Sequence, residues 1–183
     1  MADALIVVDM QNGFLREGNL ASERNLAVLP QVVAEVEQAL ADERLVIFTA
    51  DTHEVDDEEF RMFPEHCVRG TREAELADEL RAFVDTDEDD RVWVVPKRRY
   101  SAMFETQLEG ILHRFDIDRV RICGVCTDIC VMHTTSDLRN RDIPVTVAGR
   151  ATATFDAPGH DGDAVQQFAL DHMAGILGAS VER

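Results

Sequence analysis

Residues 120–130 read VRICGVCTDIC, a largely apolar run that passes into a polar turn. An apolar run of this length, bounded by polar residues, is typical of a strand that is buried in a parallel sheet. The chain holds further runs of the same kind at 4–8, 45–49, 91–95 and 144–148, and a shorter one at 179–182. We therefore expect a central sheet built from these segments.

Between these runs, hydrophobic residues recur every three or four positions, as in Leu29, Val32, Val36 and Leu40. This spacing indicates amphipathic helices, which we predict at 26–43, 74–83, 105–115, 128–140 and 163–177. Strands that alternate with helices are joined by crossovers, so the strands run parallel and helices cover both faces. The sequence thus predicts an α/β fold, doubly wound, with a mainly parallel sheet. A length of 183 residues suits a single domain over 1–183.

The chain is strongly acidic, with 36 Asp and Glu against 18 Lys and Arg and a net charge of −18. Such a surface repels polyanions, so neither nucleic acid nor an anionic membrane is an expected partner. Arginine supplies every basic residue but one, Lys97. An acidic composition with so little lysine resembles that of proteins adapted to high salt. The densest charge run, 85–91, is expected to be a solvated loop.

No targeting segment is predicted. The first apolar run is bounded by Asp3 and Asp9 and is too short for a signal-peptide core or a membrane span. Cys123, Cys126 and Cys130 crowd together, which suits a reactive thiol or a metal site better than a disulfide framework. These features predict a reduced, cytoplasmic protein, and they leave a homo-oligomer open.

Polar side chains follow the predicted strands at the points where these end. The residues after the first four runs are, in chain order, Asp9, then Asp51 and His53, then Lys97, then the turn 126–130. Doubly wound sheets bind their ligands at the carboxyl ends of the strands. We therefore expect an acid, an acid–imidazole pair, the single lysine and the cysteines to meet at one edge of the sheet.

Cys130 is a candidate nucleophile. It is expected in the first turn of the helix after the fourth run, where free N–H groups and the helix dipole favour a thiolate. Lys97 offers a compact ammonium that lowers a thiol pKa. Asp9, beside Lys97, is expected to stay ionised and to accept the thiol proton as a general base. The alternatives are a small buried hydrophobe for Cys130, a surface position for Lys97 and a turn cap for Asp9.

A second group of residues suits a divalent cation. Asp51 and His53 are two apart on an extended chain, so their side chains point to one side, and Glu59 and His66 follow in the next segment. Carboxylate and imidazole ligands suit Zn²⁺ first, with Fe²⁺ and Mn²⁺ as alternatives. The other acids in this segment are expected to be solvated: Asp56, Asp57 and Glu58.

Aromatic and histidine side chains give weaker signals. Phe14, Phe63 and Tyr100 lie near the candidate residues in sequence and suit a flat ring held between aromatic faces, although they fit a core equally well. His133 lies one helical turn after Cys130, and a helix-packing role is favoured over a pair with the thiolate. The remaining histidines show no convergent partner in the sequence: His113, His160 and His172.

Five stretches occur in the order typical of one enzyme family, at 4–14, 49–53, 63–71, 96–102 and 124–135. With these motifs the chain resembles the nicotinamidase/pyrazinamidase group of the isochorismatase-like cysteine hydrolases. The resemblance implies a catalytic triad of Asp9, Lys97 and Cys130. It also implies a cis peptide before Cys126 and an oxyanion hole formed by the N–H groups of Cys126 and Cys130.

The same resemblance implies a metal site and a reaction. Asp51, His53 and His66 would hold a divalent ion, and some members of the group add a glutamate, which here falls on Glu59. The implied substrate is a small amide: nicotinamide is hydrolysed to nicotinate and ammonia through a cysteine thioester, and the metal binds the pyridine nitrogen. Phe14 is expected to hold the ring together with the other candidate aromatics.

Two other functions remain open on the sequence. One is another amidase of the superfamily, acting on carbamoyl or ureido compounds without a metal, against which the pair His53 and His66 argues. The more distant one is a phosphoacceptor receiver domain, because Asp9, Asp51 and Lys97 imitate the spacing of its acids and its late lysine. Receivers usually carry paired acids after the first strand and end near the lysine, and this chain does neither.

Overall fold

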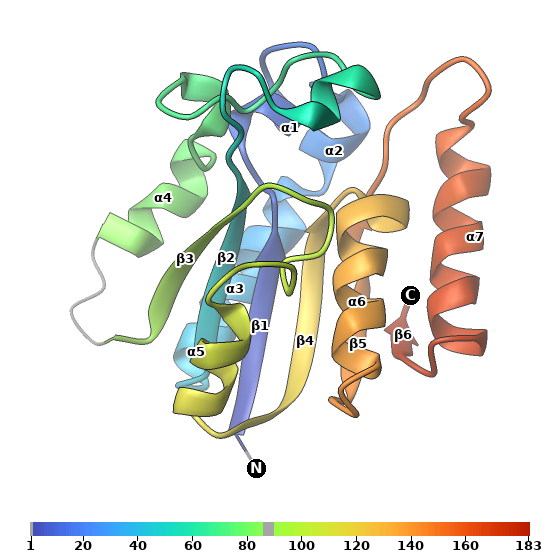
Figure 1. Ribbon diagram of the computed structural model, residues 1–183. Coiled ribbons are helices and arrows are strands. Elements are labelled where there is room, and N and C mark those ends of the chain that lie inside the picture. The colour runs from blue at the N-terminus through green and yellow to red at the C-terminus, as the bar shows by residue number, and fades with distance from the viewer. Residues whose placement is uncertain (1, 86–89) are drawn as a thin grey trace.

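The computed structural model describes residues 2–85 and 90–183 of the chain. The charge run 85–91, predicted to be a solvated loop, therefore lies for the most part outside the described residues. Six strands of the described part form one sheet in the order β3-β2-β1-β4-β5-β6 (Figure 1). They are β1 (Ala2–Val8), β2 (Leu45–Asp51), β3 (Val92–Lys97), β4 (Ile117–Val125), β5 (Val145–Ala153) and β6 (Ser180–Glu182).

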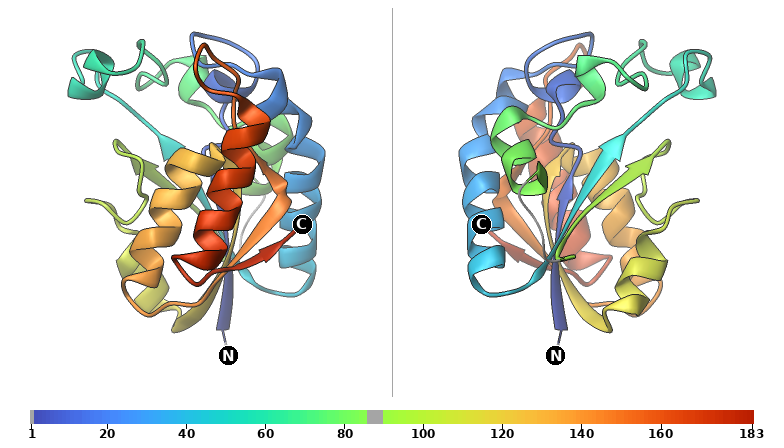
Figure 2. Two further views of the ribbon diagram at one scale, coloured as in Figure 1. Left: turned by 90° about the vertical axis from the view of Figure 1, so that its right-hand side faces the viewer. Right: turned by 90° about the vertical axis from the view of Figure 1, so that its left-hand side faces the viewer.

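Every neighbouring pair of these strands is parallel, and helices cover both faces of the sheet (Figure 2). One face carries α1 (Asn12–Leu15), α2 (Glu23–Ala27), α3 (Leu29–Ala41) and α4 (Asp78–Asp85), and the other carries α5 (Leu108–Arg114), α6 (Met132–Arg139) and α7 (Gly162–Gly175). The predicted doubly wound α/β fold is confirmed. Its winding reverses between the central strands β1 and β4, where such sheets bind ligands.

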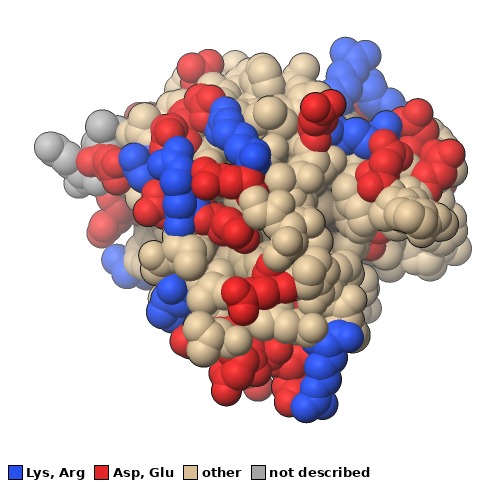
Figure 3. Space-filling model, turned by 90° about the horizontal axis from the view of Figure 1, so that it is seen from above, with Lys and Arg blue, Asp and Glu red and all other residues tan. Residues whose placement is uncertain are grey.

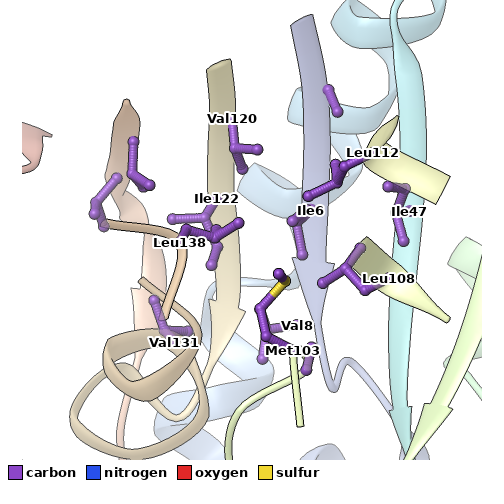
Figure 4. Close-up of a cluster of buried hydrophobic side chains, with 14 of the residues drawn as sticks. Ile6, Val8, Ile47, Met103, Leu108, Leu112, Val120, Ile122, Val131 and Leu138 are labelled. Carbon is purple, nitrogen blue, oxygen red and sulfur yellow. The ribbon is translucent and has the colours of Figure 1, made fainter. Parts of the chain in front are cut away.

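Two hydrophobic cores result from the alternation of side chains along the strands. Ile6 and Val8 point to the face of α5–α7, where they pack with residues such as Ile122 and Leu138 (Figure 4). Leu5 and Val7 point to the opposite face, into a core shared with α3 and α4. Because both faces of the central strands are buried, their side chains are apolar almost without interruption, as the sequence pattern indicated.

Four predicted helices begin elsewhere in the structure: α4 begins at Asp78 instead of 74, and α5 at Leu108 instead of 105. The helix predicted at 26–43 is divided at Val28 into α2 and α3, and Pro30 stands in the first turn of α3. Proline lacks an N–H, so it is tolerated in a first turn and disrupts a helix interior. The helix predicted at 128–140 begins as a π-helical turn, Thr127–Val131, before α6 starts at Met132.

The last residues of three strands position the candidate site. β2 and β3 extend past the predicted ends to Asp51 and Lys97, which are direct partners in the register of the two strands. In β4, Gly124 has a φ of +109°, and a Cβ there would lie 2.1 Å from the carbonyl oxygen of Val8. Only glycine allows this approach of β4 to the end of β1, and it brings the turn after β4 over Asp9.

The face above the carboxyl ends of the strands is seen directly in Figure 3. Basic side chains lie among acidic ones on this face and do not gather into one patch (Figure 3). In the described residues, no helix is both long enough and apolar enough to cross a membrane.

Candidate active site

A pocket of about 470 Å³ opens at the carboxyl ends of the central strands. Cys126 and Cys130, from the turn after β4, line it together with Ile129. The remaining lining residues come from segments that converge from both sides of the sheet: Phe14, the segment 19–24, Asp51, Glu59, Phe63, His66, Tyr100 and the segment 155–157. The pocket therefore lies where the fold predicts a ligand.

Lys97 joins the three residues predicted to do the chemistry. Its Nζ lies 2.7 Å from Asp9 Oδ2 and 3.5 Å from Cys130 Sγ. The same Nζ lies 3.1 Å from Asp51 Oδ1. All four side chains are buried. The structure thus brings together the acid, the ammonium and the thiol that the sequence places on three separate strand ends.

Burial dominates the protonation of this cluster. Burial raises the pKa of the Cys130 thiol well above its ordinary value, and the nearby Lys97 ammonium opposes this without cancelling it. Burial also raises the pKa of Asp9, again against the effect of Lys97. Desolvation thus opposes the predicted preference for a thiolate, and Cys130 keeps its proton until a base accepts it, which is the step predicted for Asp9. A raised pKa makes the Asp9 carboxylate a stronger base for that proton.

Thr49 supports Asp9, and sequence reasoning missed it. Its hydroxyl donates to Asp9 Oδ1 at 2.6 Å, and the Asp9 N–H donates to the Thr49 carbonyl at 3.2 Å. Thr49 ends the predicted second run and pairs with Val8 in the sheet. A polar residue at the end of an otherwise apolar run was the signal that could have found it.

The predicted metal ligands also converge. Asp51, His53, Glu59 and His66 each offer one ligand atom, and these four atoms lie within 4.8 Å of one another. The Nε2 atoms of His53 and His66 lie 3.2 Å and 3.4 Å from the same oxygen, Asp51 Oδ2. The Asp51 carboxylate therefore faces Lys97 with one oxygen and the two imidazoles with the other, and it connects the two groups of residues.

The orientation of the two imidazoles fits a cation. His66 Nδ1 lies 2.8 Å from the Pro64 carbonyl and His53 Nδ1 lies 3.2 Å from Asp57 Oδ2, so each Nδ1 is placed to donate its proton. With Nδ1 as the donor, each ring turns Nε2 toward Asp51 Oδ2, where a metal ion can take the place of a proton between the nitrogen and the carboxylate. Converging acceptors of this kind repel one another unless a cation lies between them, and such a second shell is typical of metal-binding histidines.

Further details of this group agree with a metal site. Glu59 Oε2 is buried and has no hydrogen-bond partner among the described residues. Gln11 holds the backbone of Asp51 from both sides, donating to its carbonyl at 2.8 Å and accepting from its N–H at 2.6 Å. The donor set is therefore buried, prearranged and incompletely satisfied by the protein itself, which suits a divalent ion.

Asp57 corrects the sequence prediction that it is solvated. Its side chain is 3% exposed, its Oδ2 lies 3.2 Å from His53 Nδ1, and it pairs with Arg99 at 2.8 Å. Burial acts to raise the pKa of Asp57, but the Glu59 N–H, His53 and Arg99 outweigh it and lower the pKa. In the sequence, the role of Asp57 was indicated only by its position four residues after His53. Acidic residues are so frequent in this chain that this spacing alone does not distinguish Asp57 from its neighbours.

The aromatic candidates all line the pocket. The ring centroids of Phe14 and Phe63 lie 5.7 Å and 6.4 Å from that of His66, and Tyr100 lies 6.3 Å from Phe63. His133 is exposed, with Nδ1 2.7 Å from the Ile129 carbonyl and its ring centroid 5.4 Å from that of Tyr100, so it does not take the helix-packing role favoured for it.

The turn after β4 contains a predicted cis peptide bond and a contact with His160 that was not predicted. The peptide bond between Val125 and Cys126 is cis, as the resemblance implied. His160, for which the sequence showed no partner, places Nε2 3.1 Å from Oδ2 of Asp128 in this turn and stacks on Phe155. A partner so distant along the chain leaves no trace in a single sequence.

Comparison with known proteins gives the same picture. A profile of the isochorismatase domain matches residues 3–180. The crystal structure of the nicotinamidase PncA from Bacillus subtilis aligns with a TM-score of 0.91 at 31% identity and covers 100% of both chains. A pyrazinamidase/nicotinamidase from Streptococcus mutans gives a TM-score of 0.91 at 32% identity, over 99% of this chain and 100% of the other.

A third solved structure, the pyrazinamidase of Pyrococcus horikoshii in complex with zinc, has a TM-score of 0.84 at 27% identity and covers 100% of this chain and 99% of its own. The profile spans nearly the whole chain, and the structural matches extend over complete proteins. This chain therefore belongs to the isochorismatase family, in its nicotinamidase-like group of amidohydrolases.

Proposed function

We propose that this protein is a nicotinamidase that hydrolyses nicotinamide to nicotinate and ammonia through a thioester on Cys130. The observation that carries the proposal is the position of Lys97, whose Nζ lies 3.5 Å from Cys130 Sγ and 2.7 Å from Asp9 Oδ2. Amide hydrolysis by a thiol needs a nucleophile, here Cys130, and a base that accepts and returns its proton, here Asp9. A positive charge between them, here the Lys97 ammonium, stabilises the thiolate. Family membership leaves the receiver-domain alternative without support.

In the proposed acylation, Asp9 accepts the proton of the Cys130 thiol. The thiolate sulfur bonds to the carboxamide carbon, and the carbonyl electron pair moves onto oxygen. The N–H groups of Cys126 and Cys130 are assigned to stabilise this oxyanion. When the carbonyl re-forms, the C–N bond breaks, and Asp9 returns its proton to the leaving ammonia.

In the proposed deacylation, water attacks the thioester carbon and gives a proton to Asp9. The C–S bond breaks, the acid product leaves, and the sulfur recovers its proton from Asp9. Lys97 keeps its charge throughout, because the neighbouring carboxylates of Asp9 and Asp51 raise the pKa of its ammonium above the ordinary value although burial acts to lower it. Its charge stabilises the thiolate when that forms.

Asp51, His53, Glu59 and His66 would hold a divalent ion. Zn²⁺ is the first choice for two imidazoles with two carboxylates, and Fe²⁺ and Mn²⁺ are the alternatives. Such an ion, when bound, supplies a Lewis acid for the ring nitrogen of the substrate. Phe14, Phe63 and Tyr100 are assigned to hold the ring, since all three line the pocket that Cys130 lines.

An ammonia-release assay tests this function. Nicotinamide, pyrazinamide and an N-carbamoyl compound are compared before chelation, after chelation and after zinc is returned. We expect the highest kcat/KM with nicotinamide, a loss on chelation and a recovery with zinc. A preference for the N-carbamoyl compound that chelation does not change would overturn the proposal in favour of the metal-independent amidase.

A further inference from the structure

The segment 155–161, between β5 and α7, contributes a wall of the pocket. It rises above the carboxyl ends of the strands before the chain descends into α7 (Figure 1). Phe155, Asp156 and Ala157 line the pocket that Cys130 also lines. The position of this segment therefore decides the shape of one side of the pocket.

This segment is braced internally. Ala157 and His160 exchange two backbone hydrogen bonds, at 2.8 Å and 3.0 Å, and the Gly162 N–H donates to Asp156 Oδ1 at 2.7 Å. The His160 ring stacks on the Phe155 ring with centroids 4.3 Å apart and planes 3° from parallel. A movement of His160 would thus carry the pocket-lining residues with it.

His160 also ties the segment to the turn that carries the nucleophile. Its Nε2 lies 3.1 Å from Asp128 Oδ2, and its Nδ1 lies 2.9 Å from the Phe155 carbonyl. In the described residues, no other hydrogen bond joins the segment 155–161 to the turn Thr127–Val131. The imidazole of His160 therefore provides the hydrogen-bonded link between the pocket wall and this turn.

Both partners of this imidazole are acceptors. A carbonyl oxygen and a carboxylate oxygen have no proton to give, so both hydrogen bonds need an N–H on the ring. Neutral imidazole has one N–H, and only the imidazolium has two. The contacts of His160 therefore require a protonated, charged ring. When the ring loses a proton, one of its nitrogens faces an acceptor oxygen with a lone pair, and that hydrogen bond is lost.

We propose that the charge-assisted hydrogen bond between His160 and Asp128 acts as a latch, which positions the segment 155–161 as one wall of the substrate pocket. His160 is thus a positioning residue for substrate binding, and this part of the inference rests on the proposed function. The nucleophile itself is held separately, because the N–H groups of Ile129 and Val131 donate to the Cys126 carbonyl at 3.1 Å. Opening the latch should therefore weaken binding and leave the chemical steps nearly unchanged.

The surroundings of His160 fix the direction of its pH dependence. Besides Asp128, the charged groups near it are Asp156, Asp161 and Asp163, with which it lines a surface hollow, and Arg24, which pairs with Asp156 and Asp163. Burial acts to lower the pKa of His160, but the hydrogen bond to Asp128 outweighs it and the pKa is raised. The latch is therefore closed below this raised pKa and opens as pH rises through it.

The first experiment needs no substrate. NMR titration of the histidine ring protons is compared in the wild type, His160→Gln and Asp128→Asn. We expect a His160 pKa above 6.5 in the wild type and a lower one in Asp128→Asn. The protection factors of the amides at 155–162, which correct hydrogen exchange for its intrinsic pH dependence, should fall in both variants, and in the wild type at alkaline pH. An unshifted His160 pKa in Asp128→Asn, or unchanged exchange, would overturn the latch whatever the enzyme hydrolyses.

The second experiment measures the effect on catalysis. Measured below the pKa of His160, each single variant should raise KM for nicotinamide about fivefold, with kcat within about twofold, as expected when one charged hydrogen bond to a partly exposed pair is lost. The double variant should be no worse than either single one, since both remove the same contact. His113→Gln on the exposed end of α5 is the matched control and should match the wild type. Additive effects of the two variants, or a loss confined to kcat, would refute positioning through the latch.

Discussion

The candidate site consists of two groups of residues that the fold assembles in different ways. Asp9 directly follows β1, Lys97 ends β3, and Cys130 lies one turn beyond β4, so the register of the four strands β3-β2-β1-β4 brings them together. Asp51 ends β2 and His53 follows it, but Glu59 and His66 lie in the segment that leaves the sheet after β2 and folds back. The first group depends on the sheet, and the second depends on a loop as well.

This difference shows in how each group is held. The nucleophile group is joined internally through the Lys97 ammonium. The metal-binding group consists mostly of acceptors and relies on outside partners, namely Asp57, the Pro64 carbonyl and Gln11, for its orientation. Variants in the two groups should therefore fail differently: the first in chemistry with a normal fold, the second in metal affinity.

The largest effect is expected from Cys130→Ala. Removal of a covalent nucleophile should lower kcat by about 10⁴-fold or more. Metal content and thermal unfolding should stay close to wild type, because the metal-binding group does not include the sulfur. Ammonia release at a wild-type rate would contradict the assignment of the nucleophile.

Lys97→Arg should lower kcat by about 10²- to 10³-fold, since a planar guanidinium cannot replace a compact ammonium between two carboxylates and a thiol. The measurement is kcat together with the melting temperature, which separates a chemical defect from misfolding. Arg98→Lys, the exposed neighbour, is the control and should be neutral. Equal activity of Lys97→Arg and wild type would show that charge alone is enough.

Gly124→Ala tests whether strand register assembles the first group. The added Cβ would lie 2.1 Å from the Val8 carbonyl oxygen at a φ of +109°, so we expect a loss of about 3 kcal/mol in the free energy of unfolding. Chemical denaturation measures it. Gly110→Ala in α5, where a Cβ would meet nothing within 4 Å, should be neutral or stabilising. Similar stabilities for the two variants would contradict the close approach of β4 to β1.

The smallest effect is expected from Asp57→Asn. The loss of the carboxylate behind His53 should weaken metal affinity about tenfold and leave the fold intact. Competition with a chromophoric chelator measures it without any assay of activity. Asp56→Asn, at the exposed neighbouring position, should have no effect. If the two variants bind metal equally well, Asp57 does not orient the ligand.

Much of the fold and the first group could be predicted from the sequence, because the apolar runs are long and each is followed by residues that a core cannot use. A doubly wound sheet has one binding edge, so placing the strands also placed Asp9, Lys97 and Cys130. The four metal-binding candidates were found through residue type, and two of them needed the loop to close. Asp51 contacts both Lys97 and His53 and so belongs to both groups, and this shared role could not be predicted from its position at the end of a strand.

The features that sequence reasoning missed depend on contacts between distant segments. Thr49 gains its role by donating a hydrogen bond to Asp9, and Asp57 gains its role by lying beside Nδ1 of His53. His160 meets Asp128 only because the chain returns over the sheet after β5. The raised pKa of Cys130 could not be predicted for a related reason: desolvation depends on the whole surrounding structure, and not on the local turn and one nearby cation alone.

The single lysine gives this protein an internal probe. The side chain of Lys97 is 0% exposed, so an amine-acylating reagent cannot reach it while the strand ends remain closed. Every acylated lysine then records one opening of the site. The rate of labelling can be followed by mass spectrometry of the peptide that contains Lys97, and it would measure how often the buried amine becomes accessible. No other side-chain amine in the chain competes for the reagent.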